Sequence, residues 1–338
     1  MKTSKSIHAM LALHVALHVA LCTALLSAGA AHAANLECIV PSKPGGAMDL
    51  TCKLAKKGLK GLDEAGDTTP TLSDMTIRYL PGGIGAVAWN SLVAQPRAKP
   101  NTLVAFSGGS LLYLAEGKFG KAKVSDVRWV AALGTDYGMI AVRADSPYKN
   151  LGDLLAAIKR NPRSVLIGLS GTAGSQDWFK MALLVRSAGI DPKVLRFVAL
   201  EGGGEAFTAM HANHVQVVSG DASEAVLYAA GGNTRVLAVL SPQRLPGVLA
   251  SSPTAREQGV DVVWPLIRGV WMGPQVPDAE YRKWVAAFDR MLASPQFAQL
   301  RSDAGLYPFA LTGDALKEYV SKAVDEYGKR ATEFGLVR

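Results

Sequence analysis

Glycine-rich turns that follow short apolar runs are the feature that most restricts the fold of this chain. From Leu36 onward, strand-like apolar runs alternate with amphipathic helical runs, which is typical of parallel α/β sheets. Each strand then leads into a small, polar turn. Parallel strands end at one edge of a sheet, so such turns gather backbone N–H groups and helix N-termini at that edge. The pattern predicts an α/β protein that binds an anion with neutral donors, and it does not favour catalysis.

The expected elements follow from apolar periodicity and from Gly and Pro punctuation. Asn150 is predicted to cap one helix, and Ser175 suits the N-terminus of another. The predicted strands are 36–40, 75–80, 102–106, 165–169, 195–200, 215–218, 236–240 and 266–272. The main turns between strands and helices are 41–46, 107–110, 170–175, 202–204 and 219–221. The last three predicted helices are 280–292, 296–304 and 315–334.

The first 34 residues are predicted to be a secretory signal peptide. Lys2 and Lys5 precede an apolar region over residues 10–27, and a small-residue A-x-A site ends at Ala33. Histidines interrupt the apolar region and no stop-transfer pattern follows, which argues against a membrane anchor. Removal of this segment lowers the formal charge from +8 to +6.

Few residues suited to metal or redox chemistry remain after the signal peptide. Only His211 and His214 are left of six histidines, so a multi-histidine metal site is not expected. Cys38 and Cys52 are left of three cysteines. In an oxidising compartment we interpret them as a structural disulfide, since the spacing of a redox or metal-binding C-x-x-C pair is absent.

Two enzyme motifs have partial matches in the sequence. Residues 83–88 match G-x-G-x-x-[GA] after a strand, but no acidic residue follows about twenty positions later to hold a ribose, so no cofactor is expected. Ser107 lies in A-F-S-G-G, close to the G-x-S-x-G elbow, and would require His211 or His214 as the base. Both histidines fall near the end of a predicted helix, which disfavours a secreted serine esterase and leaves it as an alternative.

Isolated cations beside glycines are the other candidates for anion binding. Lys43 and Arg268 are charge partners for an acidic ligand, although either could equally be a solvated surface residue. Basic runs interleaved with aromatics are absent, so nucleic acid is not an expected partner. Asp49 opens the first helix, where its carboxylate is expected to hold the preceding loop.

The loop at residues 41–52 resembles a known family motif. Its P-S-K-P-G-G-A-M-D run is similar to the P-x-x-P-G-G-x-x-D loop of substrate-binding proteins of the tripartite tricarboxylate transporter family. Further similar runs lie at 79–86, 104–110, 134–138, 201–206 and 252–259. The cysteine-bearing first loop and the run from Phe106 to Gly109 look like the tricarboxylate-binding branch.

The resemblance implies a two-lobed periplasmic binding protein, or Venus flytrap, with a mixed, mainly parallel sheet in each lobe. One lobe would comprise residues 35–136 plus 242–338, and the other residues 137–241. The family's first carboxylate contact, made by loop amides, carries over to Ser42, Gly45 and Gly46. The closing loop of the second lobe matches residues 170–176, although Ser175-Gln176-Asp177 stands where an S-x-x-H helix start is frequent.

The resulting hypothesis is a periplasmic protein that captures citrate or a related tricarboxylate or dicarboxylate between the lobes. Its partners would be a membrane permease or, alternatively, a sensor kinase, and the residues leave open whether a cation accompanies the ligand. The candidate ligand-binding residues are Ser42, Lys43, Gly45, Gly46, Ser107, Gly108, Asp136, Ser170, Ser175, Gln176, Gly203, Asp221 and Arg268.

Overall fold

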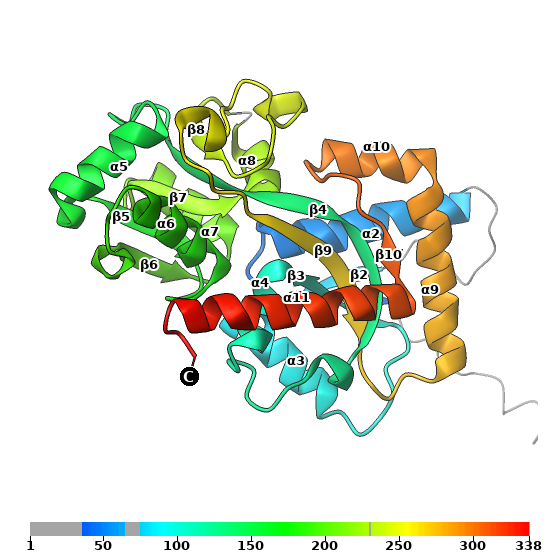
Figure 1. Cartoon of the computed structure of the whole chain (residues 1–338). Helices are drawn as coiled ribbons and strands as arrows, with labels where there is room; N and C mark the ends of the chain where they lie inside the picture. Colours follow the sequence, from blue (N-terminus) through cyan, green and yellow to red (C-terminus); the bar gives the residue numbers. More distant parts are fainter. Residues whose placement is uncertain (1–35, 65–74, 230, 338) are drawn as a thin grey trace, which may run out of the picture. The chain divides into compact units, whose positions relative to one another are not determined.

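The computed structural model describes residues 36–64, 75–229 and 231–337 (Figure 1). The predicted signal peptide lies outside the described residues. The strands are β1 Glu37–Val40, β2 Thr76–Tyr79, β3 Thr102–Ser107, β4 Arg128–Arg143, β5 Leu166–Ser170, β6 Arg196–Leu200, β7 Val217–Asp221, β8 Thr234–Val239, β9 Pro265–Met272 and β10 Leu311–Thr312. The α-helices are α2 Ala47–Glu64, α3 Ala86–Val93, α4 Gly108–Ala115, α5 Leu151–Arg160, α6 Gln176–Ser187, α7 Gly203–His211, α8 Ala222–Ala229, α9 Asp278–Ala293, α10 Pro295–Asp303 and α11 Gly313–Glu333.

The strands form one mixed sheet in the order β2-β1-β3-β9-β4-β7-β5-β6, and β8 and β10 also pair with β4. Strand β1 pairs in parallel with β2 and β3, and β5 pairs in parallel with β6 and β7. The central strands β4 and β9 are antiparallel to their neighbours. The expected α/β class with a mixed sheet is confirmed.

Strand β4 joins the parallel group β1–β3 to the parallel group β5–β7. It is not among the strands predicted from the sequence. Residues from Arg128 to Tyr137 pair with β9, whereas residues from Gly138 to Val142 pair with β7. Figure 1 shows β4 and β9 running between the green elements around β5–β7 and the blue and cyan elements around α2 and β3. The partner exchange falls next to the predicted crossover near residue 137, although the division into two lobes stays a prediction.

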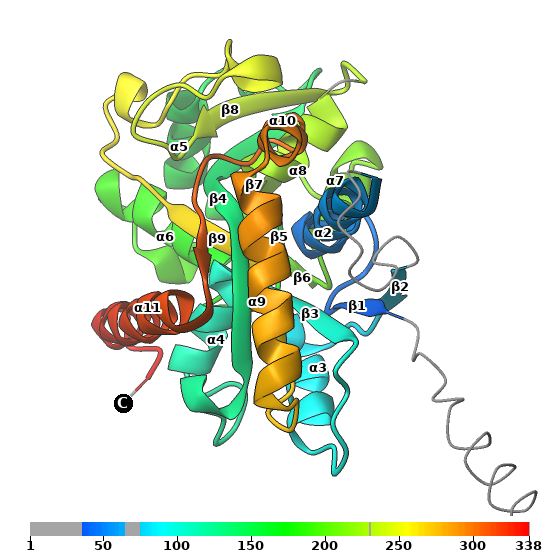
Figure 2. The ribbon, with the colours of Figure 1, turned by 90° about the vertical axis from the view of Figure 1, so that its right-hand side faces the viewer.

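Helices cover the sheet according to their apolar faces. Helices α9 and α11 pack against β4, while α2 packs against β1, β3 and β9 (Figure 2). Asn150 caps α5 as expected, because its side chain accepts a hydrogen bond from the N–H of Asp153. Ser175 caps α6 in the same way and accepts from the N–H of Trp178. Trp264 and Trp271 are both buried in the core.

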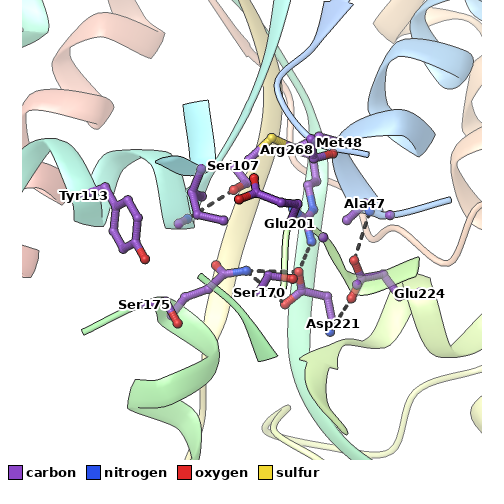
Figure 3. A pocket seen from close by; sticks show the side chains of 17 residues that line it. Ala47, Met48, Ser107, Tyr113, Ser170, Ser175, Glu201, Asp221, Glu224 and Arg268 are labelled. Carbon is purple, nitrogen blue, oxygen red and sulfur yellow. Dashed lines mark hydrogen bonds and ion pairs between the residues drawn. The ribbon is translucent and has the colours of Figure 1, made fainter. Parts of the chain in front are cut away.

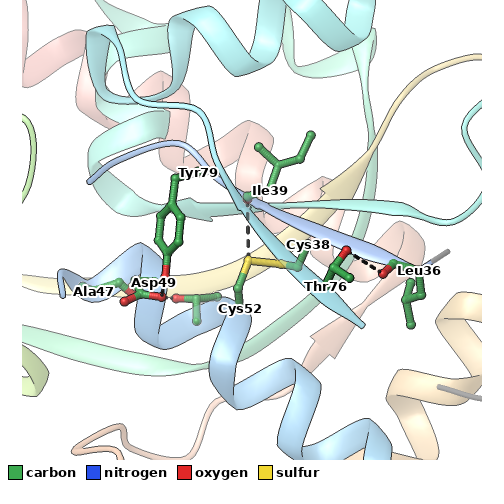
Figure 4. Close-up of a disulfide and its surroundings, with 9 residues drawn as sticks. Leu36, Cys38, Ile39, Ala47, Asp49, Cys52, Thr76 and Tyr79 are labelled. Atoms are coloured by element: carbon green, nitrogen blue, oxygen red, sulfur yellow. Dashed lines mark hydrogen bonds between the residues drawn. A yellow bond between two sulfur atoms is a disulfide. The ribbon is translucent and has the colours of Figure 1, made fainter. Parts of the chain in front are cut away.

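The predicted disulfide joins Cys38 in β1 to Cys52 in α2, with the two Cα atoms 5.7 Å apart (Figure 4). Both residues are fully buried in a core that also contains Phe288 and Met291 of α9. The bond fixes α2 on the strand that precedes the P-G-G loop, residues 41–46. The disulfide therefore anchors the P-G-G loop at both of its ends, through β1 and α2.

Among the described residues, no helix is both long enough and apolar enough to cross a membrane.

Candidate functional site at the strand ends

A small cavity lies where strands of both parallel groups end (Figure 3). Its volume is about 40 Å³, which is room for about three water molecules. Small-molecule sites are commonly several hundred Å³. The lining residues are contributed by the P-G-G loop, the ends of β3, β5 and β7, the first turns of α2, α4, α6, α7 and α8, and the middle of β9, among others.

Nine of the thirteen candidate residues line this cavity. They are Ser42, Gly46, Ser107, Ser170, Ser175, Gln176, Gly203, Asp221 and Arg268. Lys43 is instead half-exposed and donates to Glu205 over 2.7 Å. Gly45 lies in the adjoining turn, Gly108 packs under Leu266, and Asp136 is buried below Arg268.

The P-G-G turn is held by hydrogen bonds of its own. Gly45 has φ +85°, a conformation that a side chain would strain. Its N–H donates to Oδ2 of Asp49 over 2.8 Å, and the hydroxyl of Tyr79 donates to Oδ1 over 2.9 Å. Asp49 therefore holds the loop, as expected from its place in the first turn of α2.

Arg268 forms part of the cavity wall but is not a free cation. It is 1% exposed and donates through Nη2 to Asp136 over 2.9 Å and also to Asp221. Burial opposes the charged form of Arg268, but the two aspartates outweigh it and raise the pKa. Ser223 donates to Asp136 as well, over 2.6 Å from its hydroxyl.

A second buried cation, Lys180 of α6, lies behind the same wall. Its Nζ donates to Asp177 over 2.7 Å, to the carbonyl oxygen of Gly220 over 2.7 Å, and to Asp221 over 2.5 Å. Burial alone would lower the pKa of Lys180, yet the two aspartates raise it. Asp177 also accepts from the N–H of Ser170 over 2.9 Å, which fixes the turn after β5.

Acidic groups outnumber basic ones in this buried cluster. Asp136, Asp177, Asp221 and Glu224 are within it, against Lys180 and Arg268. Burial raises the pKa of Glu224 to about 8, and the charges of Asp221 and Asp177 act in the same direction. Glu224 is therefore largely protonated at neutral pH, and burial also raises the pKa of Asp136 and of Asp177.

Glu224 spans two parts of the cavity wall. Its Oε1 accepts from the N–H of Ala47 over 3.0 Å, and its Oε2 accepts from the N–H of Asp221 over 3.1 Å (Figure 3). Ala47 begins α2, whereas Asp221 precedes α8. Glu224 itself is 4% exposed.

Further contacts join the segments predicted to belong to different lobes. The hydroxyl of Tyr228 donates to the carbonyl oxygen of Gly45 over 3.1 Å. On the other side of the cavity, the N–H of Thr172 donates to the hydroxyl of Tyr113 over 3.0 Å. Lys118 donates to the carbonyl oxygen of Ala173 over 3.0 Å. These contacts close the cavity from two sides.

Several lining residues were missed by the sequence reading, namely Ala47, Met48, Ile84, Gly109, Tyr113, Glu201, Gly202 and Glu224. Three of them, Ala47, Gly109 and Gly202, are next in sequence to candidate residues of the predicted turns. The turns therefore already indicated that these three lie near the cavity. Glu224 carries the pattern Asp221-x-x-Glu224, the acidic analogue of a helix-capping box, and this could have marked the start of α8.

The triad required by the esterase alternative is not assembled around Ser107. The Oγ of Ser107 accepts from the N–H of Gly109 over 3.2 Å and caps α4. Neither His211 nor His214 lines the cavity, and Nε2 of His211 is paired with Oγ1 of Thr234 at 2.9 Å. Across the described ranges, no group of three or more His, Cys, Asp and Glu side chains is arranged to hold a metal ion.

Comparisons with known proteins identify the family of this chain. A model described as the tripartite tricarboxylate transporter family receptor matches residues 83–336. The chain belongs to this receptor family. Its relatives include a UPF0065 protein of Bordetella pertussis, which is 22% identical over 319 residues, covering 92% of this chain and 94% of the relative.

Solved structures share the fold of this family member. MatC from Rhodopseudomonas palustris with bound malate matches with a TM-score of 0.73 and 20% identity, covering 87% of this chain and 98% of that one. Another R. palustris protein, solved with adipate, matches with a TM-score of 0.75 and 20% identity, covering 89% and 97%. The periplasmic binding protein BugD matches with a TM-score of 0.76 and 17% identity, covering 89% of this chain and 98% of that one, so the fold is that of periplasmic binding proteins.

Proposed function

We propose that this protein is a periplasmic solute-binding protein that captures citrate or a related tricarboxylate or dicarboxylate. The ligand is held in the cavity at the strand ends and delivered to a membrane permease of the tripartite tricarboxylate transporter type. The observation that carries the proposal is the meeting of the P-G-G loop, Ser107, Ser175 and Gly203 around one cavity. Malate and adipate in the related structures support a carboxylate ligand.

Recognition by neutral donors fits the charges of the site. Arg268 and Lys180 are both engaged by buried aspartates, so neither offers an unpaired charge to a ligand. Backbone N–H groups at helix starts and the hydroxyl of Ser175, which accepts from Trp178 and keeps its own hydrogen, can donate to carboxylate oxygens without such a charge. The net positive charge of the whole chain then attracts anions at long range rather than recognising them.

Ligand entry requires the cavity walls to separate. The cavity of about 40 Å³ is an order of magnitude smaller than common small-molecule sites. The contacts Tyr228 to Gly45 and Tyr113 to Thr172 would break on opening, and they join segments of different predicted lobes. A hinge at the predicted crossovers, near residues 137 and 241, would open the cavity, and a ligand that contacts both sides would favour closure.

The test is calorimetric titration of ligand-stripped protein with citrate, isocitrate, tricarballylate, succinate, malate and adipate. We expect saturable one-to-one binding of at least one of them. The variant Gly46→Ala would place its Cβ 3.3 Å from the N of Gly203 and should weaken that binding, by about tenfold or more. Gly328→Ala, where nothing lies within 4 Å, should leave it unchanged. No binding of any carboxylate would refute the proposal.

A further inference from the structure

Glu224 makes a contact that a capping residue does not require. Its Oε2 accepts from the N–H of Asp221, which satisfies the start of α8. Its Oε1 reaches Ala47, which is 177 residues away in sequence and begins α2. One carboxyl group therefore links the second predicted lobe to the P-G-G loop of the first.

The position of Oε1 is suited to a carboxylate from a ligand. The first N–H groups of a helix have no partner within the helix, and the helix dipole favours a negative charge there. Ala47 begins an 18-residue helix, and its N–H points at the carboxyl of Glu224. Gly46, Ala47 and Glu224 all line the cavity, so a ligand in the cavity would meet the same N–H group.

Three glycines leave room around this carboxyl group. A Cβ added to Gly203 would collide with Oε1 of Glu224, and one added to Gly220 would lie 2.9 Å from Oε2. A Cβ on Gly46 would lie 3.5 Å from Oε1. These glycines come from the P-G-G loop, the start of α7 and the end of β7. The backbone of three segments thus encloses a carboxyl group next to the cavity.

We propose that Glu224 is a resident carboxyl group that occupies, when the cavity is closed, the place at the start of α2 that a carboxylate of the ligand takes. Binding then displaces Oε1 of Glu224 from Ala47, so the internal group competes with the ligand and sets the affinity threshold. The inference rests on the proposed function only for the identity of the competing ligand. The contact between Glu224 and Ala47 exists without it.

The electrostatic surroundings of Glu224 favour this exchange. Asp221 and Asp177 act against its ionised form and Arg268 acts in favour of it, and burial keeps it largely protonated at neutral pH. A neutral acid accepts a weaker hydrogen bond from an N–H group than a carboxylate does. An ionised ligand carboxylate therefore binds the N–H of Ala47 more strongly than Glu224 does.

The first test uses acetate as the probe and needs no natural ligand. Thermal unfolding of Glu224→Ala is compared in sodium acetate and in sodium chloride of equal ionic strength. Acetate should fill the vacated place and raise the Tm saturably, by about 2 °C or more at saturating concentration. Wild type should respond less, because Glu224 already holds the place. Equal responses of variant and wild type, or none in either, would overturn the proposal.

Glu205→Ala is the matched control, since Glu205 also links the two predicted lobes, through Lys43, but lies outside the cavity lining. Acetate should not stabilise it more than wild type. A stabilisation as large as that of Glu224→Ala would mean non-specific binding and would count against the proposal.

Glu224→Gln provides a second readout that does not depend on the folding of the alanine variant. Its amide can accept from only one of the two N–H groups, so it should hold the place less well. Acetate should stabilise it more than wild type, and citrate should bind it several-fold more tightly. Weaker or unchanged citrate binding would overturn the proposal. If citrate binds neither protein, the choice of citrate fails while the acetate result still decides the role of Glu224.

Discussion

At the scale of single residues, the buried charges at the site are paired with one another. Arg268 contacts two aspartates, Lys180 contacts two, and Asp221 is common to both cations. Burial of Asp221 opposes its ionisation, but Lys180 and Arg268 outweigh that effect and lower its pKa. Both buried cations in the cavity wall are therefore engaged by aspartates.

Removal of Arg268 should destabilise the protein strongly. Arg268→Met leaves Asp136 buried without its cation and Asp221 paired with Lys180 alone, at a cost of about 3–5 kcal/mol. Urea unfolding followed by circular dichroism measures the loss. Arg256→Met is the matched control, since its pair with Asp261 is exposed and should contribute little. Equal stability of the two variants would contradict the account of the buried cluster.

Glu224 should give stability a dependence on pH. Its folded pKa of about 8 exceeds the ordinary value of 4.5, so the folded state binds the proton more tightly than the unfolded state. Stability from this group is full below about pH 4.5, falls as pH rises towards 8, and is lost above it. The slope in that window reaches up to about 1.4 kcal/mol per pH unit.

Urea unfolding of wild type and Glu224→Gln between pH 5 and pH 8 isolates that slope, because the neighbouring acids Asp136, Asp177 and Asp221 are present in both proteins. Wild type should lose more stability than the variant across the window. Parallel curves would show that Glu224 ionises normally in the folded state.

At the scale of secondary-structure elements, the two helical glycines Gly58 and Gly328 should respond oppositely to alanine. Gly58 of α2 faces α9 and α10, and a Cβ there would lie 2.5 Å from the Sδ of Met291 and 2.7 Å from Phe297. Gly58→Ala should therefore destabilise the protein, by about 1–3 kcal/mol. Gly328 of α11 has nothing within 4 Å, and Gly328→Ala should stabilise by about 0.5–1 kcal/mol.

Denaturant midpoints of the two glycine variants against wild type provide the measurement. A gain in stability for both variants would mean that α2 is not packed against α9 and α10 as described.

Elements marked by a capping residue or by apolar spacing could be predicted from the sequence. Elements that depend on pairing with strands far away in the sequence could not. Helix α5 was predicted because Asn150 and the spacing of its leucines are local signals. Strand β4 was missed because its 16 residues include Gly134, Asp136 and Gly138, which break an apolar run. Those residues fit there because β4 exchanges partners from β9 to β7 at that point. Helix α4 was missed because two glycines open it.

The same limit applies to the candidate site. Turns that follow strands predicted Gly46, Ser107 and Gly203 at the cavity, since the topology of parallel strands brings such turns together. Lys180 could not be anticipated, because a lysine in an amphipathic helix usually faces water. Its burial depends on Asp221, which lies 41 residues away.

At the scale of the whole molecule, ligand entry requires an opening motion. The contacts of Tyr228 and Tyr113 join segments on opposite sides of the cavity, whose volume is about 40 Å³. Tyr228→Phe removes the hydroxyl that donates to Gly45 and keeps the ring stacked on Phe207. We expect the variant to open more often and show a larger radius of gyration in X-ray scattering without ligand.

Saturating ligand should return the Tyr228→Phe variant to the wild-type radius. Tyr319→Phe, at an exposed tyrosine of α11, is the control and should scatter like wild type. Identical curves for all three proteins in both conditions would contradict the proposed opening.

The most direct test of the central claim is a crystal structure of the protein with the carboxylate that calorimetry identifies. We expect carboxylate oxygens within hydrogen-bonding distance of the N–H of Ala47 and of donors at Ser107 or Ser175. We also expect the carboxyl of Glu224 to have left Ala47. A ligand bound outside this cavity, or one held there by Arg268 after release from Asp136 and Asp221, would contradict the claim that neutral donors recognise the carboxylate.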